Sequence, residues 1–203
     1  AEWIANGASE TQIDAALRVQ GAASRDFNNS PKKSLRLLFR AELGESRLQK
    51  PVLSSGGTSL ADFNTLVLRA DYNNSWIHWD AAQRLRGISV HDQWVRDTQI
   101  ALSGSGSHGN HVNLFVNGRY WGLYNAAERT DAAFAANYFG GRREDYDAMT
   151  QDGIRDGDNV AWNAMIAAAR GDLATRAQYE ALGQYLDVDH FIDYMIVNLY
   201  GSN

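Results

Sequence analysis

The chain has 203 residues, of which 44% are hydrophobic and 11% aromatic, enough for one large domain or two lobes, so wholesale disorder is excluded. Its net charge of −5 argues against a nucleic-acid partner, because duplex-binding domains carry a basic excess. The absence of cysteine excludes disulfides, thiolate metal sites and cysteine nucleophiles. No apolar run approaches the roughly 18 residues of a membrane helix, so we expect no membrane span.

Strand patterns dominate the first half of the chain. Apolar residues alternate with arginines over 35–40, and a second apolar run covers 65–69, so both segments are predicted strands. The clearest element is a hairpin that joins 112–116 to 119–124 through Asn117-Gly118. Both residues of this pair tolerate the positive φ that a type I′ turn requires.

One helix is predicted among these strands, over 90–102. Its expected apolar face consists of Val90, Trp94, Val95, Thr98 and Leu102.

The second half has helical periodicity. We expect helices over 130–139 with Thr130 as N-cap, over 160–170 with Asp158 as cap, and over 175–186. A last helix should begin after an Asp187 or Asp189 cap and end before Gly201. Its apolar face is formed by Phe191, Ile192, Met195, Ile196 and Leu199.

Strands therefore come first and helices second, which predicts an α+β protein. We expect a β-rich part with one helix over 1–127 and a helical part over 128–203. The last helix is more apolar than three short neighbours can cover. For this reason we expect the chain to be a fragment whose helical part is incomplete.

A basic region lies between two predicted strands. Residues 18–50 hold eight bases against three acids, and small residues at 21–25 precede Lys32 and Lys33. Phosphate binding needs closely approaching backbone N–H groups and a nearby cation, whereas a flexible turn beside a basic strand edge explains the same composition. Strand alternation places Lys33 on the apolar face with Leu35, so Lys33 is the better ligand candidate.

Two histidines end a segment rich in glycine and serine, 103–111. The segment lacks the lysine of a phosphate loop and precedes a strand, so it is expected to be a mobile connection. The spacing of His108 and His111 would suit a metal, but no third ligand lies close in sequence.

Asp152, Asp156 and Asp158 resemble an oxygen-rich calcium loop without the EF-hand spacing, so loop and cap roles are favoured. Three tryptophans lie on periodic faces and are expected in the core, not on a sugar-binding platform. They are Trp94, Trp121 and Trp162.

Many segments of the chain resemble the CotH family, the spore-coat protein H group of atypical protein kinases, and they occur in the order expected for that family. The most specific is NGRYWGLYN at 117–125, which is followed by Glu128-Arg129. The matching segments are 24–25, 31–37, 66–69, 96–97, 112–125, 128–129, 131, 138–141, 145–147, 156–158, 162–163, 185–189 and 191–194.

This resemblance implies a protein-kinase-like fold in which an antiparallel N-lobe and a helical C-lobe hold Mg-ATP. Residues 21–25 would cover the phosphates, Lys33 or else Lys32 would bind them, and Asp97 would be the acidic partner of that lysine. The segment 124–128 would be the hinge that offers backbone groups to adenine. The implied site residues are Gly21, Ser24, Arg25, Lys32, Lys33, Arg69, Asp97, Tyr124 and Glu128.

The implied function is ATP-dependent phosphorylation of Ser or Thr in a coat, surface or extracellular protein, with ATP and magnesium as cofactors. In the family, the catalytic Asp and the metal ligands follow the last helix. They are therefore expected beyond Asn203, and this chain alone should be inactive. The alternative is a kinase-like binding or adhesion module without catalysis. Export is suggested by the resemblance alone.

Overall fold

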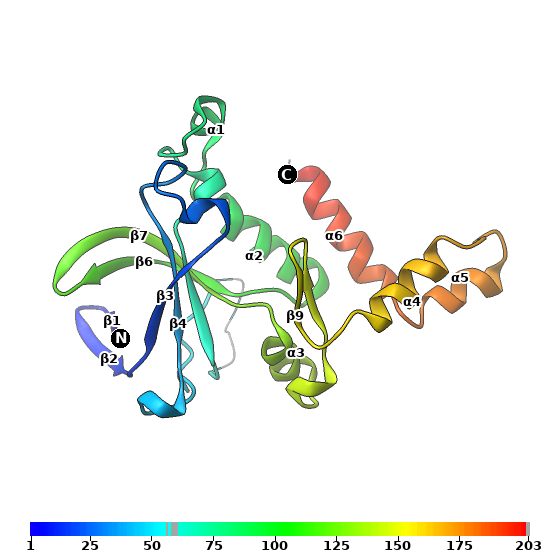
Figure 1. Ribbon diagram of the computed structural model, residues 1–203, viewed down its shortest axis with the longest axis horizontal. Coiled ribbons are helices and arrows are strands. Elements are labelled where there is room, and N and C mark those ends of the chain that lie inside the picture. Colours follow the sequence, from blue (N-terminus) through cyan, green and yellow to red (C-terminus); the bar gives the residue numbers. More distant parts are fainter. Residues whose placement is uncertain (56, 58–60, 202–203) are drawn as a thin grey trace. The chain divides into compact units, whose positions relative to one another are not determined.

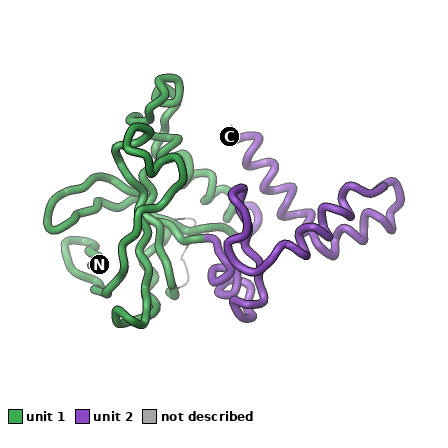
Figure 2. The backbone as a smooth tube through the Cα atoms, in the orientation of Figure 1, with its two compact units in different colours: residues 1–100, 106–129 green, residues 101–105, 130–203 purple. Residues whose placement is uncertain are grey.

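A computed structural model describes residues 1–55, 57 and 61–201. The chain divides into two compact units (Figure 2), of which unit 1 comprises residues 1–100 and 106–129. Unit 2 comprises residues 101–105 and 130–203. The fold is α+β, because an antiparallel sheet dominates unit 1 and helices dominate unit 2.

Unit 1 is built on a five-stranded antiparallel sheet with the order β3-β4-β5-β7-β6 (Figure 1). The strands are β3 (Ala16–Gln20), β4 (Ser34–Leu38), β5 (Thr65–Arg69), β6 (Gly109–Val116) and β7 (Arg119–Glu128). The predicted strands at 35–40 and 65–69 are confirmed. The predicted turn between β6 and β7 is also confirmed, since φ is 50° at Asn117 and 75° at Gly118.

A second hairpin precedes this sheet and was not predicted. Strands β1 (Glu2–Ala5) and β2 (Ala8–Gln12) pair in antiparallel fashion. The turn again consists of Asn and Gly, with φ of 52° at Asn6 and 78° at Gly7. The same dipeptide signal therefore marks both hairpins.

The core of unit 1 lies on one face of the sheet. Leu35 pairs with Leu68 and Leu37 with Leu66, so alternate residues of β4 and β5 point to the same side. The segments that connect the strands cover this face with buried apolar residues. These include Ile13, Phe39, Leu48, Val52, Leu53 and Phe63. The opposite face of the sheet carries Arg36, Arg69 and Asn125 together with apolar residues such as Val67.

Helix α2 (His91–Ser103) confirms the predicted helix at 90–102, but the expectation of its buried face is wrong. Trp94 is 51% exposed, whereas Gln93 is only 6% exposed. The helix turns polar residues inward because the strand opposite presents Asn125, which is 1% exposed and hydrogen-bonds to Gln93. The shorter helix α1 (Ala81–Arg86) precedes it.

The expectation that three tryptophans lie in the core is also wrong. Trp94, Trp121 and Trp162 are 51%, 57% and 50% exposed. Trp121 lies where the register of β6 and β7 shifts, after Leu114, so simple strand alternation does not place its side chain.

Unit 2 contains four helices and one short hairpin among the described residues. They are α3 (Ala132–Phe139), β8 (Ala148–Thr150), β9 (Gly153–Asp156), α4 (Val160–Ala169), α5 (Arg176–Leu182) and α6 (Val188–Tyr200). Helix α6 keeps part of its apolar face exposed, with Ile192 at 49% and Leu199 at 72%. Among the described residues, no helix combines the length and apolar character that crossing a membrane requires.

The helix caps of unit 2 mostly follow the predicted positions. There are two exceptions, since the N-cap of α4 is Asn159 and not Asp158, and that of α3 is Asp131 and not Thr130. The Asp131 carboxylate accepts from two backbone N–H groups of the first turn. Thr175 caps α5 in a capping box, and Asp187 caps α6. Asp158 accepts from the N–H of Val160 at 2.8 Å, next to the N-cap of α4.

Candidate functional site

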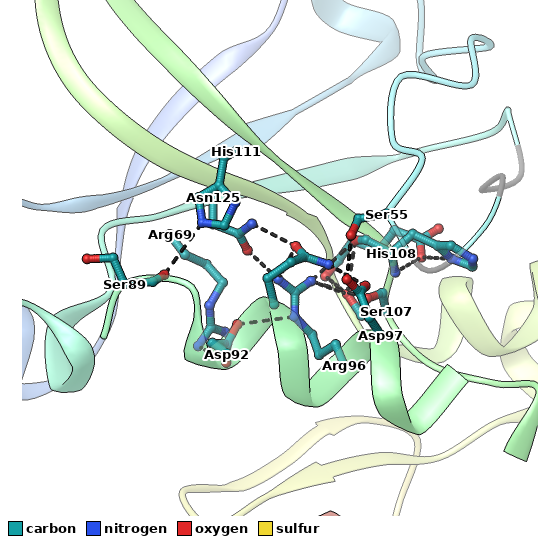
Figure 3. Close-up of polar contacts among 12 residues, drawn as sticks. Ser55, Arg69, Ser89, Asp92, Arg96, Asp97, Ser107, His108, His111 and Asn125 are labelled. Atoms are coloured by element: carbon teal, nitrogen blue, oxygen red, sulfur yellow. Dashed lines mark hydrogen bonds and ion pairs between the residues drawn. The ribbon is translucent and has the colours of Figure 1, made fainter. Parts of the chain in front are cut away.

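The polar face of α2 is joined to the sheet through Arg96 (Figure 3). The guanidinium donates to Gln93 Oε1 at 2.8 Å, to Asn125 Oδ1 and to the carbonyl oxygens of Ser107 and His108. The Arg96 side chain is only 15% exposed, and burial lowers its pKa while the Asp92 carboxylate opposes that shift. A buried cation with this many acceptors fixes α2 on β7 and on the segment before β6.

Asp92 connects this network to the sheet cation Arg69. Its Oδ1 accepts from Arg69 at 2.9 Å and its Oδ2 from Arg96 at 3.1 Å. Arg69 ends strand β5, and 46% of its side chain is exposed. Because a guanidinium has five N–H donors, one ion pair leaves Arg69 with donors for an anion. The site therefore contains a partly exposed cation held by a helix carboxylate.

Asp97 was expected to be the acidic partner of the phosphate lysine, and the structure places its carboxylate against Ser55 and Gln93. Its carboxylate accepts from Ser55 Oγ at 2.5 Å and from Gln93 Nε2 at 2.6 Å. Asp97 thereby ties α2 to Ser55, which in turn forms an isolated β-bridge with Gly109 at the start of β6. The acid of α2 that meets a sheet cation is Asp92, five residues earlier.

Lys32, just before β4, and Asp71, just after β5, are two half-buried charges that attract each other. The Lys32 ammonium donates to the carbonyl oxygen of Leu123 and lies 4.4 Å from the centre of the Tyr124 ring. Burial lowers the pKa of Lys32, and burial raises the pKa of Asp71, while their mutual attraction opposes both shifts. Asp71 has a left-handed backbone, with φ of 53°, and its Oδ1 is buried without a hydrogen-bond partner among the described residues. Perturbed groups of this kind cluster at functional sites.

Lys33 has a different environment from Lys32. Its ammonium donates to the carbonyl oxygens of Ser24 at 3.2 Å, of Asp26 at 2.8 Å and of Ser30. Strand alternation does not distinguish the two lysines, because β4 begins at Ser34, after both of them. Among the described residues, Lys32 has one hydrogen-bond acceptor and so retains unused ammonium donors, whereas all three donors of Lys33 are matched.

The remaining candidates of the expected phosphate loop lie together between β3 and β4. Gly21 has φ of 126°, and a Cβ at this position would lie 2.1 Å from Ser24 Oγ, so only glycine fits. Ser24 and Arg25 belong to a short 3₁₀ turn, Ala23–Arg25, whose arginine is exposed. The structure brings these residues together with Lys33.

The segment 124–128 was expected to be the hinge that offers backbone groups to adenine, and the structure places it within a strand. It lies inside β7, which pairs with β5 on one side and with β6 on the other, so its backbone groups are used by the sheet. The Tyr124 hydroxyl donates to the carbonyl oxygen of Lys33 at 3.0 Å. The Glu128 carboxylate accepts from the backbone N–H of His108 at 2.8 Å and contacts its Nδ1 at 3.0 Å. Both residues therefore anchor neighbouring segments.

The histidine segment differs from the mobile connection that was expected. Ser107 and His108 are 8% and 7% exposed, because Arg96 and Glu128 bind them. His111 Nε2 lies 3.5 Å from the carbonyl oxygen of Ser89. Across residues 1–55, 57 and 61–201, no group of three or more His, Cys, Asp or Glu residues could hold a metal ion.

The three aspartates of the calcium-like loop have separate partners in unit 2. Asp152 pairs with Arg155 at 3.1 Å, Asp156 accepts from the N–H of Ala132 at 3.3 Å, and Asp158 accepts from the N–H of Val160. These contacts agree with the favoured loop and cap roles.

The sequence reasoning missed several residues of the site. A signal was present, since Asp92 and Arg96, like Gln93 and Asp97, are spaced by four residues on one helix and so share a face. These polar residues and the apolar residues Val90 and Trp94 lie on different sides of the helix, and the sequence alone does not say which side is buried. The missed residues are Asp71, Asp92, Gln93, Arg96 and Asn125, whereas His108 was considered only as a metal ligand.

One comparison with known proteins gives a match. The family model described as "CotH kinase protein" matches residues 17–203. No curated protein matches the chain.

Proposed function

The chain belongs to the CotH family, and we propose that it is the nucleotide-binding part of a protein kinase. The nucleotide is Mg-ATP, and it binds on the face of the unit 1 sheet that carries Arg69 and Asn125. The phosphate acceptor is Ser or Thr of a coat, surface or extracellular protein. This acceptor class rests on the family alone, whereas the nucleotide proposal also rests on geometry.

The ion pair between Arg69 and Asp92 carries the proposal. Protein kinases bind the ATP phosphates with a cation on the third strand of the N-lobe sheet, and a Glu of the following helix holds that cation. In chain order, β5 is the third strand of the five-stranded sheet, and α2 is the long helix before the last two strands. Arg69 on β5 and Asp92 on α2 therefore stand in the corresponding places, with Arg replacing Lys and Asp replacing Glu.

Lys32 supplies a second positive charge for the phosphates. Its ammonium has three N–H donors, and the described residues provide one acceptor, the carbonyl oxygen of Leu123. A desolvated cation interacts more strongly with an anion than an exposed one does, because the effective dielectric constant is lower. Lys32 and Arg69 both act on Asp71 electrostatically, so the cations are near the same acid.

Magnesium would neutralise the phosphate oxygens and orient the transferred group. Since the described residues contain no group of three metal ligands, we assign no magnesium ligand to this chain. The chain itself contributes the positive charges of Arg69 and Lys32, which bind the phosphates, and the carboxylate of Asp92, which positions Arg69.

Isothermal titration calorimetry with Mg-ATP tests the proposal, using the protein and its Arg69→Met variant. A hydrogen bond to a charged group contributes about 1.5 to 3 kcal/mol, so the variant should bind roughly 10- to 100-fold more weakly. Arg119→Met is the matched control, since it removes an exposed arginine at the start of β7 in the same unit.

Each outcome has a definite meaning. Loss of affinity in Arg69→Met but not in Arg119→Met supports the proposal. Equal affinity in all three proteins removes Arg69 from the site. Absence of Mg-ATP binding by the unaltered protein contradicts the proposal and favours a kinase-like binding or adhesion module. Transfer to Ser or Thr is tested separately, by mass spectrometry of coat or surface proteins incubated with the natural full-length protein and ATP.

A further inference from the structure

Lys33 is the centre of a closed set of hydrogen bonds in the segment 21–33, the loop that joins β3 to β4. Its three ammonium donors are matched by three carbonyl oxygens, those of Ser24, Asp26 and Ser30. The ring of Phe27 adds a cation–π contact, with its centre 5.6 Å from Nζ. A phosphate could reach this ammonium only by displacing a carbonyl oxygen.

Other contacts fold the loop back on itself around this centre. The N–H of Ser30 donates to the carbonyl oxygen of Asp26 at 3.1 Å, and Asn29 Nδ2 donates to that of Ala23 at 3.1 Å. Ser30 is 3% exposed, and its hydroxyl donates to the carbonyl oxygen of Lys32 at 2.7 Å. The loop is therefore ordered by local polar contacts and not by an apolar core, since Phe27 is 72% exposed.

Removal of the ammonium would affect three parts of the loop at once. The three carbonyl oxygens come from positions spread over seven residues, 24–30, and they converge on one atom. Without the positive charge, their negative ends would face one another. The loop would then gain backbone freedom, which nucleotide binding would have to remove again.

We propose that Lys33 is a positioning residue, which holds the loop 21–33 in the conformation that receives the nucleotide phosphates. This inference rests on the proposed function. Lys32, whose ammonium contacts β7 and not the loop carbonyls, supplies charge to the ligand. Two adjacent lysines thus have separate roles, one in ordering the loop and one in binding.

The first test measures the loop without any ligand. Hydrogen exchange of the amides of 21–33 is compared in the unaltered protein, Lys33→Met and Lys32→Met, where methionine keeps an unbranched side chain and removes the charge. Exchange should be roughly tenfold faster in Lys33→Met, corresponding to about 1.4 kcal/mol of lost order, and nearly unchanged in Lys32→Met. Lys33→Arg, which restores a donor-bearing cation, should recover part of the protection.

The second test measures Mg-ATP affinity of the same proteins over a range of ionic strength. Lys33→Met should weaken binding about tenfold, because the loop must be ordered on binding, with a salt dependence like that of the unaltered protein. Lys32→Met should weaken binding and also flatten the salt dependence, since a direct charge contact is lost.

The outcomes separate this inference from the proposed function. Fast exchange together with weaker, normally salt-dependent binding in Lys33→Met supports the positioning role. Unchanged exchange overturns it, as does fast exchange with unchanged affinity. A flattened salt dependence in Lys33→Met also overturns it, because Lys33 would then contact the phosphate directly. Absence of ATP binding by the unaltered protein overturns the proposed function and the positioning role with it, while the exchange result still reports whether Lys33 orders the loop.

Discussion

Replacement of Arg96 by methionine tests whether the buried polar network holds α2 on the sheet. The substitution keeps much of the side-chain stem and removes every guanidinium donor. Some acceptors keep another partner, since Asp92 still accepts from Arg69, and Gln93 Oε1 still accepts from Asn125 Nδ2 at 2.7 Å. Asn125 Oδ1 and the carbonyl oxygen of Ser107 lose the donor that Arg96 provided.

The size of the effect follows from burial. Asn125 is 1% exposed and Ser107 is 8% exposed, so water reaches neither acceptor easily. An unsatisfied buried group costs about 1–3 kcal/mol, and removal of one partner of a buried ion pair typically costs about 3–5 kcal/mol. The substitution also removes the cost of burying the Arg96 charge, and this effect raises the free energy of unfolding. We therefore expect the free energy of unfolding of unit 1 to fall by about 3 kcal/mol.

Urea unfolding followed by tryptophan fluorescence measures this change in the right part of the chain. Five of the six tryptophans, Trp3, Trp76, Trp79, Trp94 and Trp121, belong to unit 1. Since m-values of small domains are about 1–3 kcal/mol per molar urea, the midpoint should shift down by roughly 1–3 M.

Arg119→Met is the matched control for this measurement. Arg119 begins β7 in the same unit, and its side chain is exposed. Surface substitutions of this kind usually change stability by less than about 0.5 kcal/mol, so this variant should scarcely shift the midpoint. If Arg96→Met were as stable as Arg119→Met, the network would not be what holds α2, and the reasoning from burial would be refuted.

Two further substitutions probe the surroundings of the site. Burial raises the pKa of Asp71, so its charge destabilises the fold at neutral pH, and Asp71→Asn should raise the melting temperature at pH 7. The gain should vanish below about pH 3, where the carboxyl is neutral in both folded and unfolded chains; an equal gain at both pH values would contradict the electrostatic cause. Gly109→Ala would place a Cβ 2.5 Å from Gln93 Oε1 and 2.8 Å from the carbonyl oxygen of Ala126. It should lower the urea midpoint through a loss of about 1–3 kcal/mol, and an unchanged midpoint would show that α2 can move away from the sheet.

Local signals in the sequence predicted where the elements of unit 1 lie. The pair Asn117-Gly118 specified its turn because both residues accept positive φ, and this property belongs to the residues themselves. The position of α2 was likewise predicted from its period. Its buried face was not, because Gln93 and Trp94 are adjacent, and the choice between them depends on what β7 presents, namely Asn125.

The candidate site was predictable as a region but not as a set of contacts. The basic loop before β4 and the cation Arg69 were both identified from sequence. The partners of these cations were not, because each pair joins residues far apart in the chain, such as Arg69 with Asp92 and Lys32 with Leu123. Strand alternation could not distinguish the contacts of Lys32 from those of Lys33, because β4 begins at Ser34 and both lysines lie outside the strand.

Asp92 shares its two carboxylate oxygens between two arginines, one from the sheet and one from its own helix. If an incoming anion draws Arg69 away, the Asp92 carboxylate is still paired with Arg96, so no buried charge is left without a partner. The energy needed to recruit Arg69 is then close to that of an exposed ion pair, and not to that of a buried one. Because Arg96 stays with Asn125 throughout, α2 can remain in place while Arg69 exchanges partners.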